Sequence, residues 1–376
     1  MRNTVARYLR AAALAAAGLQ LLTGCQSMAG SSDSGSTTLP AFKVDAAWPK
    51  PLPENWILGQ VAGIAVARDD TIWVIHRPAT LVDDEKGALA SPPATKCCKP
   101  APPVLQFDRQ GNLQRSWGGP GAGYDWPQSE HGIFVDDDGN VWLAGNDAVD
   151  HQILKFTPDG RFLQQIGRAR SNGGSNSATQ LGRPAHLIVD RASNELIVAD
   201  GYLNRRVVVF DAATGNYKRH WGAYGNRPND DKQNAYDPKA APSVQFGNPV
   251  HCVRMSNDRL LYVCDRVNDR IQVFKPDGTF VTEFRIEPDT LQNGSVWDLV
   301  LSEDREQKYI FIADGANNQI LTIERLSGRV LTQWGRAGRM AGQFKWVHNM
   351  AIDSKGNLYT AEVGTGRRAQ KFERIR

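Results

Sequence analysis

The sequence has little of what marks several large classes of protein. Its 376 residues include only five cysteines, too few for a disulfide-rich scaffold of this length. The formal net charge is +4, which by itself gives no reason to expect a nucleic-acid partner. No long segment shows helical apolar periodicity, and Gly-x-Ser-x-Gly, Walker and Cys-x-x-Cys motifs are absent. At 41% hydrophobic and 22% charged residues, the chain as a whole is not expected to be disordered.

The first 25 residues have the pattern of an export signal. Three arginines precede an apolar run, and the tetrapeptide Leu22–Cys25 follows it. This ending resembles a bacterial lipobox, in which the cysteine becomes the lipidated first residue; an ordinary signal peptide with a chance cysteine is the alternative. We predict a signal peptide over residues 1–24, lipidation of Cys25 and a flexible Ser/Gly/Thr-rich tether over 25–41. Gln26 after the anchor resembles the sorting pattern of the outer membrane, facing the periplasm.

The remaining residues, 42–376, repeat one unit of short strands and polar turns six times. The units start at residues 63, 131, 186, 251, 297 and 348. Units of this length with about four strands each are typical of β-propeller blades. The sixth unit lacks its last strand, and the strand-like segment AFKVDAAW before the first unit can complete it. We therefore predict an all-β fold, a six-bladed β-propeller closed by an N-terminal strand.

Details of the repeats, such as the entry WGRAGRMAGQF and the turn KPDG, resemble NHL repeats. Three insertions interrupt the units, at residues 78–103, 168–180 and 223–245. Long loops in a compact fold are often functional lids, although they can also be merely mobile. The sequence assigns no role to them.

Four of the seven histidines stand at the start of the first strand of a unit: His131, His186, His251 and His348. The innermost strand of each blade lines the central channel, so equivalent positions converge on one axis. Blades two, four and six are related by three-fold rotation, so His131, His251 and His348 would form an open tripod suited to a catalytic zinc ion. For His186, in blade three, a fourth ligand, support for the other ligands and plain packing all remain open.

Several segments around these histidines match the motifs of one enzyme family. HGIFVDDDGNVWL, HCVRM and VHNMAIDSKGNLYTAE carry the three histidines, and VADGYLNRRVVVF, YVCDRVNDRIQVF and QVAGIAVARDDTIWVIHRP lie between or before them. Together they resemble the peptidyl-α-hydroxyglycine α-amidating lyases, six-bladed propellers with zinc on three channel histidines. The resemblance implies an active-site tyrosine at Tyr202 and active-site arginines at Arg77 and Arg266. A loop aromatic and polar ties between blades are the structural alternatives for these side chains.

The same resemblance implies a structural calcium ion beside the zinc. Its ligands would be the backbone carbonyls of Val61 and Ile133 and the side chain after the third histidine. That residue is acidic in the family and is Asn349 here. An amide oxygen can bind calcium but carries no charge, so the sequence leaves the calcium ion open.

The implied function is a zinc-dependent carbon–nitrogen lyase. It would cleave an N-acyl-α-hydroxyglycine-type substrate, a small molecule or a peptide C-terminus, to an amide and glyoxylate. Tyr202 would take the hydroxyl proton, and Arg77 and Arg266 would hold the carboxylate. Two other functions stay open: a metal-dependent lactonase or other hydrolase, and a non-enzymatic envelope propeller that binds a peptide or glycan. A membrane contact is expected through the lipid anchor alone.

Two cysteine pairs are candidates for disulfides in an oxidising compartment. Cys252 and Cys264 lie on neighbouring strands of one predicted hairpin, which is compatible with a bridge between them. A vicinal bridge between Cys97 and Cys98, in the first insertion, is the second candidate.

Overall fold

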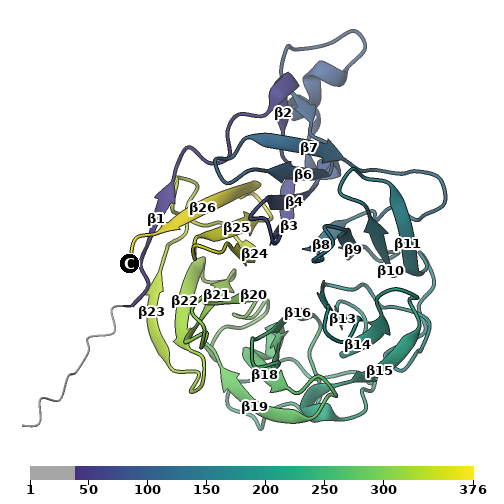
Figure 1. Ribbon diagram of the computed structural model, residues 1–376, viewed down its shortest axis with the longest axis vertical. Coiled ribbons are helices and arrows are strands. Elements are labelled where there is room, and N and C mark those ends of the chain that lie inside the picture. Colours follow the sequence, from purple (N-terminus) through teal and green to yellow (C-terminus); the bar gives the residue numbers. More distant parts are fainter. Residues whose placement is uncertain (1–38) are drawn as a thin grey trace, which may run out of the picture. The chain divides into compact units, whose positions relative to one another are not determined.

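The fold of this protein is known from a computed structural model that describes residues 39–376 (Figure 1). The predicted signal peptide, the lipidation site Cys25 and most of the predicted tether lie outside the described residues. Within residues 39–376 the regular structure consists of strands and a few short 3₁₀ helices. No helix in this part of the chain has the length and apolar character needed to cross a membrane.

Six four-stranded antiparallel sheets form the blades of a ring, which confirms the predicted propeller (Figure 1). The strands of blades one to three are β3 (Gln60–Val66), β4 (Ile72–Arg77), β6 (Val104–Phe107) and β7 (Leu113–Trp117); β8 (Glu130–Val135), β9 (Val141–Gly145), β10 (Gln152–Phe156) and β11 (Phe162–Gly167); and β12 (His186–Asp190), β13 (Glu195–Asp200), β14 (Arg206–Asp211) and β15 (Tyr217–Trp221). The predicted unit starts fall close to the first strand of each blade.

Blades four to six follow the same plan. Their strands are β16 (Val250–Met255), β17 (Leu261–Asp265), β18 (Arg270–Phe274) and β19 (Phe280–Arg285); β20 (Asp298–Leu301), β21 (Tyr309–Asp314), β22 (Gln319–Glu324) and β23 (Val330–Trp334); and β24 (Val347–Ile352), β25 (Leu358–Glu362), β26 (Arg368–Arg374) and β1 (Phe42–Asp45). The first strands β3, β8, β12, β16, β20 and β24 contact one another around the centre of the ring.

The N-terminal strand closes the ring as predicted. β1 pairs antiparallel with β26, with Phe42 opposite Arg374 and Val44 opposite Phe372. Phe42 also packs edge-on against Phe311 of blade five. The sixth sheet is thus completed by a strand from the other end of the chain, which leaves the ring without an open edge between its first and last blades.

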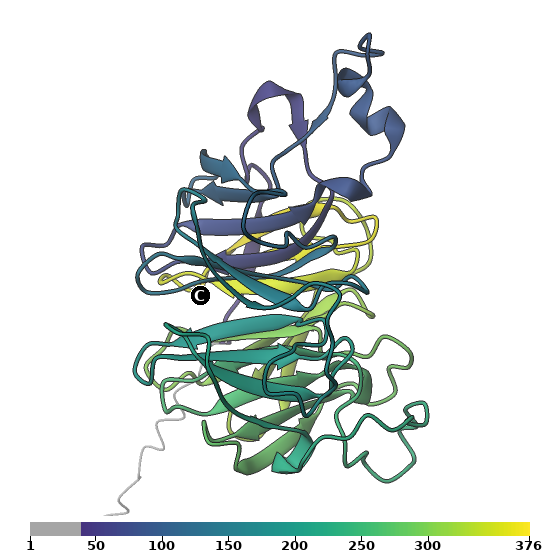
Figure 2. The same ribbon diagram turned by 90° about the vertical axis from the view of Figure 1, so that its right-hand side faces the viewer.

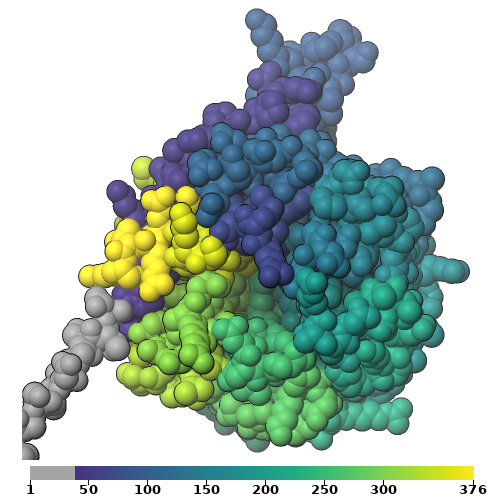
Figure 3. Space-filling model, in the orientation of Figure 1, coloured from purple at the N-terminus to yellow at the C-terminus, as the bar shows by residue number. Residues whose placement is uncertain are grey.

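Apolar side chains between neighbouring blades make up the core. Figure 3 shows the blades packed side by side around the ring. Between blades four and five, for example, Tyr262 and Ile271 pack with Leu299 and Ile312. Inner and middle strands are covered by a blade on either side, so they contain continuous apolar runs such as VVVF at 207–210. Tight turns join the strands, and at the Asp136–Asn140 turn the positive φ of 83° is taken by a glycine.

The three insertions all lie at the end of the ring where the inner strands begin. The first joins β4 to β6 and contains η2 (Pro78–Thr80), η3 (Asp83–Leu89) and β5 (Lys99–Pro100), which pairs with β2 (Trp56–Ile57) after η1 (Pro53–Asn55). The second joins β11 to β12, and the third joins β15 to β16 and begins with η4 (Ala223–Gly225). Figure 2 shows the first and third insertions on the same side of the molecule.

Both candidate disulfides are formed in the structure. Cys252 on β16 and Cys264 on β17 lie opposite each other in the hairpin and are bonded. Cys97 and Cys98 are bonded as neighbours in the first insertion.

Candidate metal centre

Three histidines stand at breaks in the pairing of the inner strands. The register shifts between Glu130 and Ile133, between Val250 and Cys252, and between Val347 and Asn349. His131, His251 and His348 lie inside these β-bulges. A bulge carries an extra residue and re-aims its side chain, and bulges are common beside active sites. The local irregularity of β8, β16 and β24 therefore sets the direction of the three imidazoles.

The three imidazoles meet, as the sequence predicted. Their ligand nitrogens all lie within 4.8 Å of one another. The ring centroids are 4.7 Å apart for His131 and His348, 4.9 Å for His251 and His348, and 5.2 Å for His131 and His251. Each residue is at most 3% exposed. A buried group of this size can hold one metal ion.

His186 does not belong to this group. His186 pairs in regular register with Ala199, the residue before Asp200. In blade four the matching pair is Cys252 with Cys264, the residue before Asp265. His186 therefore matches Cys252 and not His251. It stands one step further along its strand than the other three, although the repeats align it with them. Its Nδ1 accepts a hydrogen bond from the Val253 amide at 3.5 Å. Of the three roles left open by the sequence, packing agrees best with this position.

Backbone carbonyls from the odd-numbered blades orient the three ligands. Nδ1 of His131 donates to the Ala185 carbonyl at 2.7 Å, and Nδ1 of His348 donates to the Ala62 carbonyl at 2.7 Å. Nδ1 of His251 donates in the same way to the Trp297 carbonyl. A carbonyl only accepts, so the hydrogen must sit on Nδ1 and the Nε2 lone pair is left to bind a metal.

The surroundings keep the imidazoles neutral. Burial lowers the pKa of His131, His251 and His348, the last to about 3. Burial is the largest cause in each case. The second largest is a charge effect, which comes from His348 for the pKa of His131, from Arg266 for that of His251 and from Arg77 for that of His348. Metal binding requires the neutral imidazole, and these lowered pKa values leave all three rings unprotonated at neutral pH.

Tyr202 joins the histidines from blade three. It follows β13, and its hydroxyl lies 2.9 Å from Nε2 of His131 and 3.1 Å from Nε2 of His251. Nη1 of Arg266 donates to the same oxygen at 3.4 Å. The structure therefore places the Tyr202 hydroxyl against the Nε2 atoms of two of the three histidines.

Arg77 comes from blade one and Arg266 from blade four. Arg77 ends β4, and its Nε donates to the Glu130 carbonyl at 2.7 Å, while its pKa is lowered by burial. Arg266 begins η5 (Arg266–Asn268) and stacks on the Trp297 ring, 4.6 Å from its centre. Within residues 39–376 neither guanidinium forms a salt bridge, and the buried Nε of Arg266 has no hydrogen-bond partner. Their charge is therefore available to an anionic ligand.

A third arginine at the site was not found from the sequence. The Arg183 guanidinium lies 5.7 Å from the centre of the Tyr202 ring, and its Nε donates to the Asn146 carbonyl at 2.8 Å. Asn146 also accepts from Nη2 of Arg77 at 3.1 Å through its side chain. Asn146 thus holds two guanidinium groups beside Tyr202. A single arginine in a loop belongs to no motif. The only sequence feature that could have pointed to Arg183 is its position just before the start of unit three.

Of the three residues implied for calcium, Asn349 is engaged by other protein groups. Val61 and Ile133 lie on the inner strands β3 and β8, as expected. The Oδ1 atom of Asn349, the one side-chain ligand, instead accepts a hydrogen bond from the Ile64 amide at 2.7 Å, and its Nδ2 donates to Asp298. Asn349 is thus engaged on both sides by protein groups.

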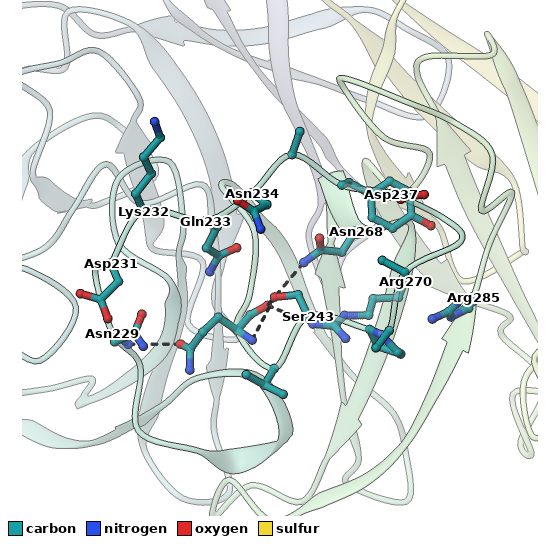
Figure 4. Close-up of a pocket in the computed structure, with 17 residues that line it drawn as sticks. Asn229, Asp231, Lys232, Gln233, Asn234, Asp237, Ser243, Asn268, Arg270 and Arg285 are labelled. Atoms are coloured by element: carbon teal, nitrogen blue, oxygen red, sulfur yellow. Dashed lines mark hydrogen bonds between the residues drawn. The ribbon is translucent and has the colours of Figure 1, made fainter.

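Two surface pockets beside the third insertion lie away from the histidines. One of about 450 Å³ is enclosed by the third insertion, with Arg270, Arg285 and Asn268 on its wall (Figure 4). None of the predicted site residues lines it. The candidate metal centre is defined by side chains that converge from the inner strands β8, β16 and β24.

Comparisons with known proteins agree with this picture in part. No family model matches the chain. It is 31% identical over 169 residues to peptidyl-alpha-hydroxyglycine alpha-amidating lyase 1 of Drosophila melanogaster, covering 43% of this chain and 29% of that protein. It is 30% identical over 156 residues to peptidyl-glycine alpha-amidating monooxygenase of Mus musculus, covering 41% of this chain but only 14% of that protein.

A longer but weaker match is to NHL repeat-containing protein 3 of Mus musculus, 25% identical over 353 residues, covering 89% of this chain and 84% of that protein. Among solved structures, a streptogramin B lyase superposes with a TM-score of 0.51 at 12% identity, covering 89% of this chain and 98% of that chain. That likeness concerns the fold alone. The chain is thus a six-bladed β-propeller whose homologues include peptidyl-α-hydroxyglycine α-amidating lyases and NHL repeat proteins.

Proposed function

We propose that this protein is a metal-dependent carbon–nitrogen lyase that cleaves an N-acyl-α-hydroxyglycine-type substrate to an amide and glyoxylate. One observation carries the proposal above the others. Three buried imidazoles present their Nε2 atoms to one point, and the Tyr202 hydroxyl lies within 3.1 Å of two of them. The partial matches to amidating lyases support the same chemistry.

Zinc is the metal we propose for His131, His251 and His348. Three neutral imidazoles with an open fourth position are typical of catalytic zinc sites. A zinc ion there supplies Lewis acidity toward an oxygen of the substrate. The carbonyls of Ala62, Ala185 and Trp297 fix the rings in the orientation this requires.

Tyr202 is the proposed proton carrier. In its ionised form the phenolic oxygen takes the proton of the substrate hydroxyl. The hydroxyl-bearing carbon then becomes the aldehyde carbon of glyoxylate, the carbon–nitrogen bond breaks, and its electron pair goes to the amide nitrogen. The same proton passes from Tyr202 to that nitrogen, so the tyrosine ends each cycle as it began.

Arg77, Arg183 and Arg266 are the proposed carboxylate-binding groups. A guanidinium offers a planar fork of donors that matches a carboxylate. With the imidazoles neutral, the three arginines leave the site positively charged, which favours an anionic substrate. Binding the carboxylate would hold the hydroxyl-bearing carbon against Tyr202 and the histidine group.

Glyoxylate release tests the function directly. The purified chain loaded with zinc should convert N-benzoyl-α-hydroxyglycine to benzamide and glyoxylate, and His348→Ala should abolish the reaction. His186→Ala, which changes a buried histidine outside the group, is the matched control and should stay active. A zinc-loaded protein that releases no glyoxylate from any N-acyl-α-hydroxyglycine would contradict the proposal. Hydrolysis of a lactone by the same sample would favour a metal-dependent hydrolase, and a metal-free protein a peptide- or glycan-binding propeller.

We also propose that the protein is exported and anchored in the bacterial envelope through a lipid on Cys25, with no other membrane contact. The residues concerned are the basic and apolar N-terminal segment and its Leu22–Cys25 ending. Cys25→Ser should move the protein from the membrane fraction to the soluble fraction. Unchanged fractionation would contradict the anchor.

A further inference from the structure

We infer that this protein folds and works without calcium, because the buried ion pair of Arg254 and Asp298 engages Asn349, the one side chain that the calcium ion would need. The inference concerns the inner strands β16, β20, β24 and β3. It does not depend on the lyase activity.

Arg254 reaches from β16 across to the next two blades. Its Nη2 lies 2.7 Å from Oδ2 of Asp298 on β20 and 2.8 Å from the carbonyl oxygen of Met350 on β24. Its Nε lies 3.4 Å from Oδ1 of Asp298. One cation thus joins the inner strands of blades four, five and six, with a carboxylate and a backbone carbonyl as its partners.

Asp298 is the anion of this cluster. Its side chain is fully buried, and its Oδ2 accepts hydrogen bonds from the Met350 amide at 2.8 Å and from Nδ2 of Asn349. Burial raises the pKa of Asp298, and the Arg254 charge is the largest effect opposing this. The buried carboxylate thus has one cation and two further hydrogen-bond donors as protein partners.

The hydrogen bonds of Asn349 explain why this position does not hold the acidic residue that the resemblance led us to expect. Because Asp298 only accepts, the Nδ2 of Asn349 must face it, and Oδ1 is then turned to the Ile64 amide on β3. An acidic side chain at position 349 would have no hydrogen to donate and would repel Asp298. The preceding residue, His348, is bound to the same strand through the Ala62 carbonyl. The cluster therefore ties blades four to six and one together directly beside a metal ligand.

Calcium dependence of the wild-type protein decides the inference. Purified full-length protein would be analysed for metal content by mass spectrometry, and its melting temperature measured in EGTA and in millimolar CaCl₂. We expect no stoichiometric calcium and the same melting temperature in both buffers. One calcium ion per chain, or a melting temperature that rises with calcium, would overturn the inference.

Variants of the ion pair test the role of the guanidinium. Arg254→Met leaves the Asp298 carboxylate buried without its cation and should lower the melting temperature by about 5 °C. Replacing both partners, Arg254→Met with Asp298→Asn, removes the uncompensated charge and should recover at least half of that loss. If Arg254→Met is too unstable to purify, the double variant and the wild type still decide. An Arg254→Met protein as stable as the wild type would also overturn the inference.

Discussion

The even-numbered and odd-numbered blades use the same part of the same strand in different ways. In blades two, four and six, a bulge presents a histidine to the centre of the ring. In blades three, five and one, the matching positions present a backbone carbonyl, from Ala185, Trp297 and Ala62 respectively. Each histidine is held by the carbonyl of the blade that follows it. The six repeats thus form three pairs of neighbouring blades, and in each pair one blade provides a histidine and the next blade provides the carbonyl that orients it.

This difference shows how one repeat can carry two functions. A side chain is needed for the metal, while a main-chain carbonyl is enough to fix the ring that binds it. The odd-numbered blades are then free to contribute other groups, and blade three supplies both Tyr202 and, just before β12, Arg183.

The largest effect is expected from removing a ligand in an even-numbered blade. His131→Ala, His251→Ala and His348→Ala each leave two imidazoles, and zinc should fall from about one ion per chain to near zero, with loss of activity. His186→Ala in blade three should keep its metal. Metal content after gel filtration checks this, with circular dichroism to confirm folding. Metal loss from His186→Ala equal to that from His348→Ala would remove the distinction between the two kinds of blade.

Tyr202 tests what an odd-numbered blade contributes to chemistry. Tyr202→Phe keeps the ring beside His131 and His251 but removes the oxygen that moves the proton. We expect turnover to fall about 10²- to 10⁴-fold with zinc content unchanged. Steady-state kinetics and metal analysis on the same sample separate these outcomes. Full activity in the variant would exclude Tyr202 as the proton carrier.

Much of the fold could be predicted because the repeats carry it. Six unit starts, the closing strand at Phe42 and the meeting of His131, His251 and His348 follow from periodicity and ring symmetry. The offset of His186 could not be foreseen, because a bulge adds one residue to a strand without changing its apolar pattern.

Other parts of the site depend on contacts between residues of different blades, and the sequence of a single repeat unit does not predict such contacts. Arg254 and Asp298 lie in different repeats, and nothing in either repeat shows that they pair. Arg183 and Asn146 likewise come together only through the ring. The sequence left the calcium ion open because of one substituted position, Asn349, and the partners of that side chain are seen only in the structure.

The pH dependence of metal retention tests the environment of the even-numbered blades. A proton competes with the metal for Nε2 of each histidine, and it competes more strongly the closer the pKa of the ring lies to the ordinary value near 6.5. Burial places the pKa of His348 at about 3 and those of His131 and His251 well below 6.5. Protons therefore compete weakly, and zinc should stay bound at pH 5 while the fold persists. Metal loss with a midpoint near pH 6.5, with unchanged circular dichroism, would contradict the lowered pKa values.

The smallest effect is expected at Arg183, the arginine that blade three adds to the site. It is partly exposed and shares Asn146 with Arg77, so its loss leaves the buried Arg77 and Arg266 in place. Arg183→Met should raise KM for the carboxylate substrate about tenfold, the value of one charge-assisted hydrogen bond, with little change in kcat. A substrate whose carboxylate is replaced by a neutral amide should bind equally to both proteins. Equal KM values for the carboxylate substrate would restrict the anion site to Arg77 and Arg266, and blade three would then contribute through Tyr202 and the Ala185 carbonyl alone.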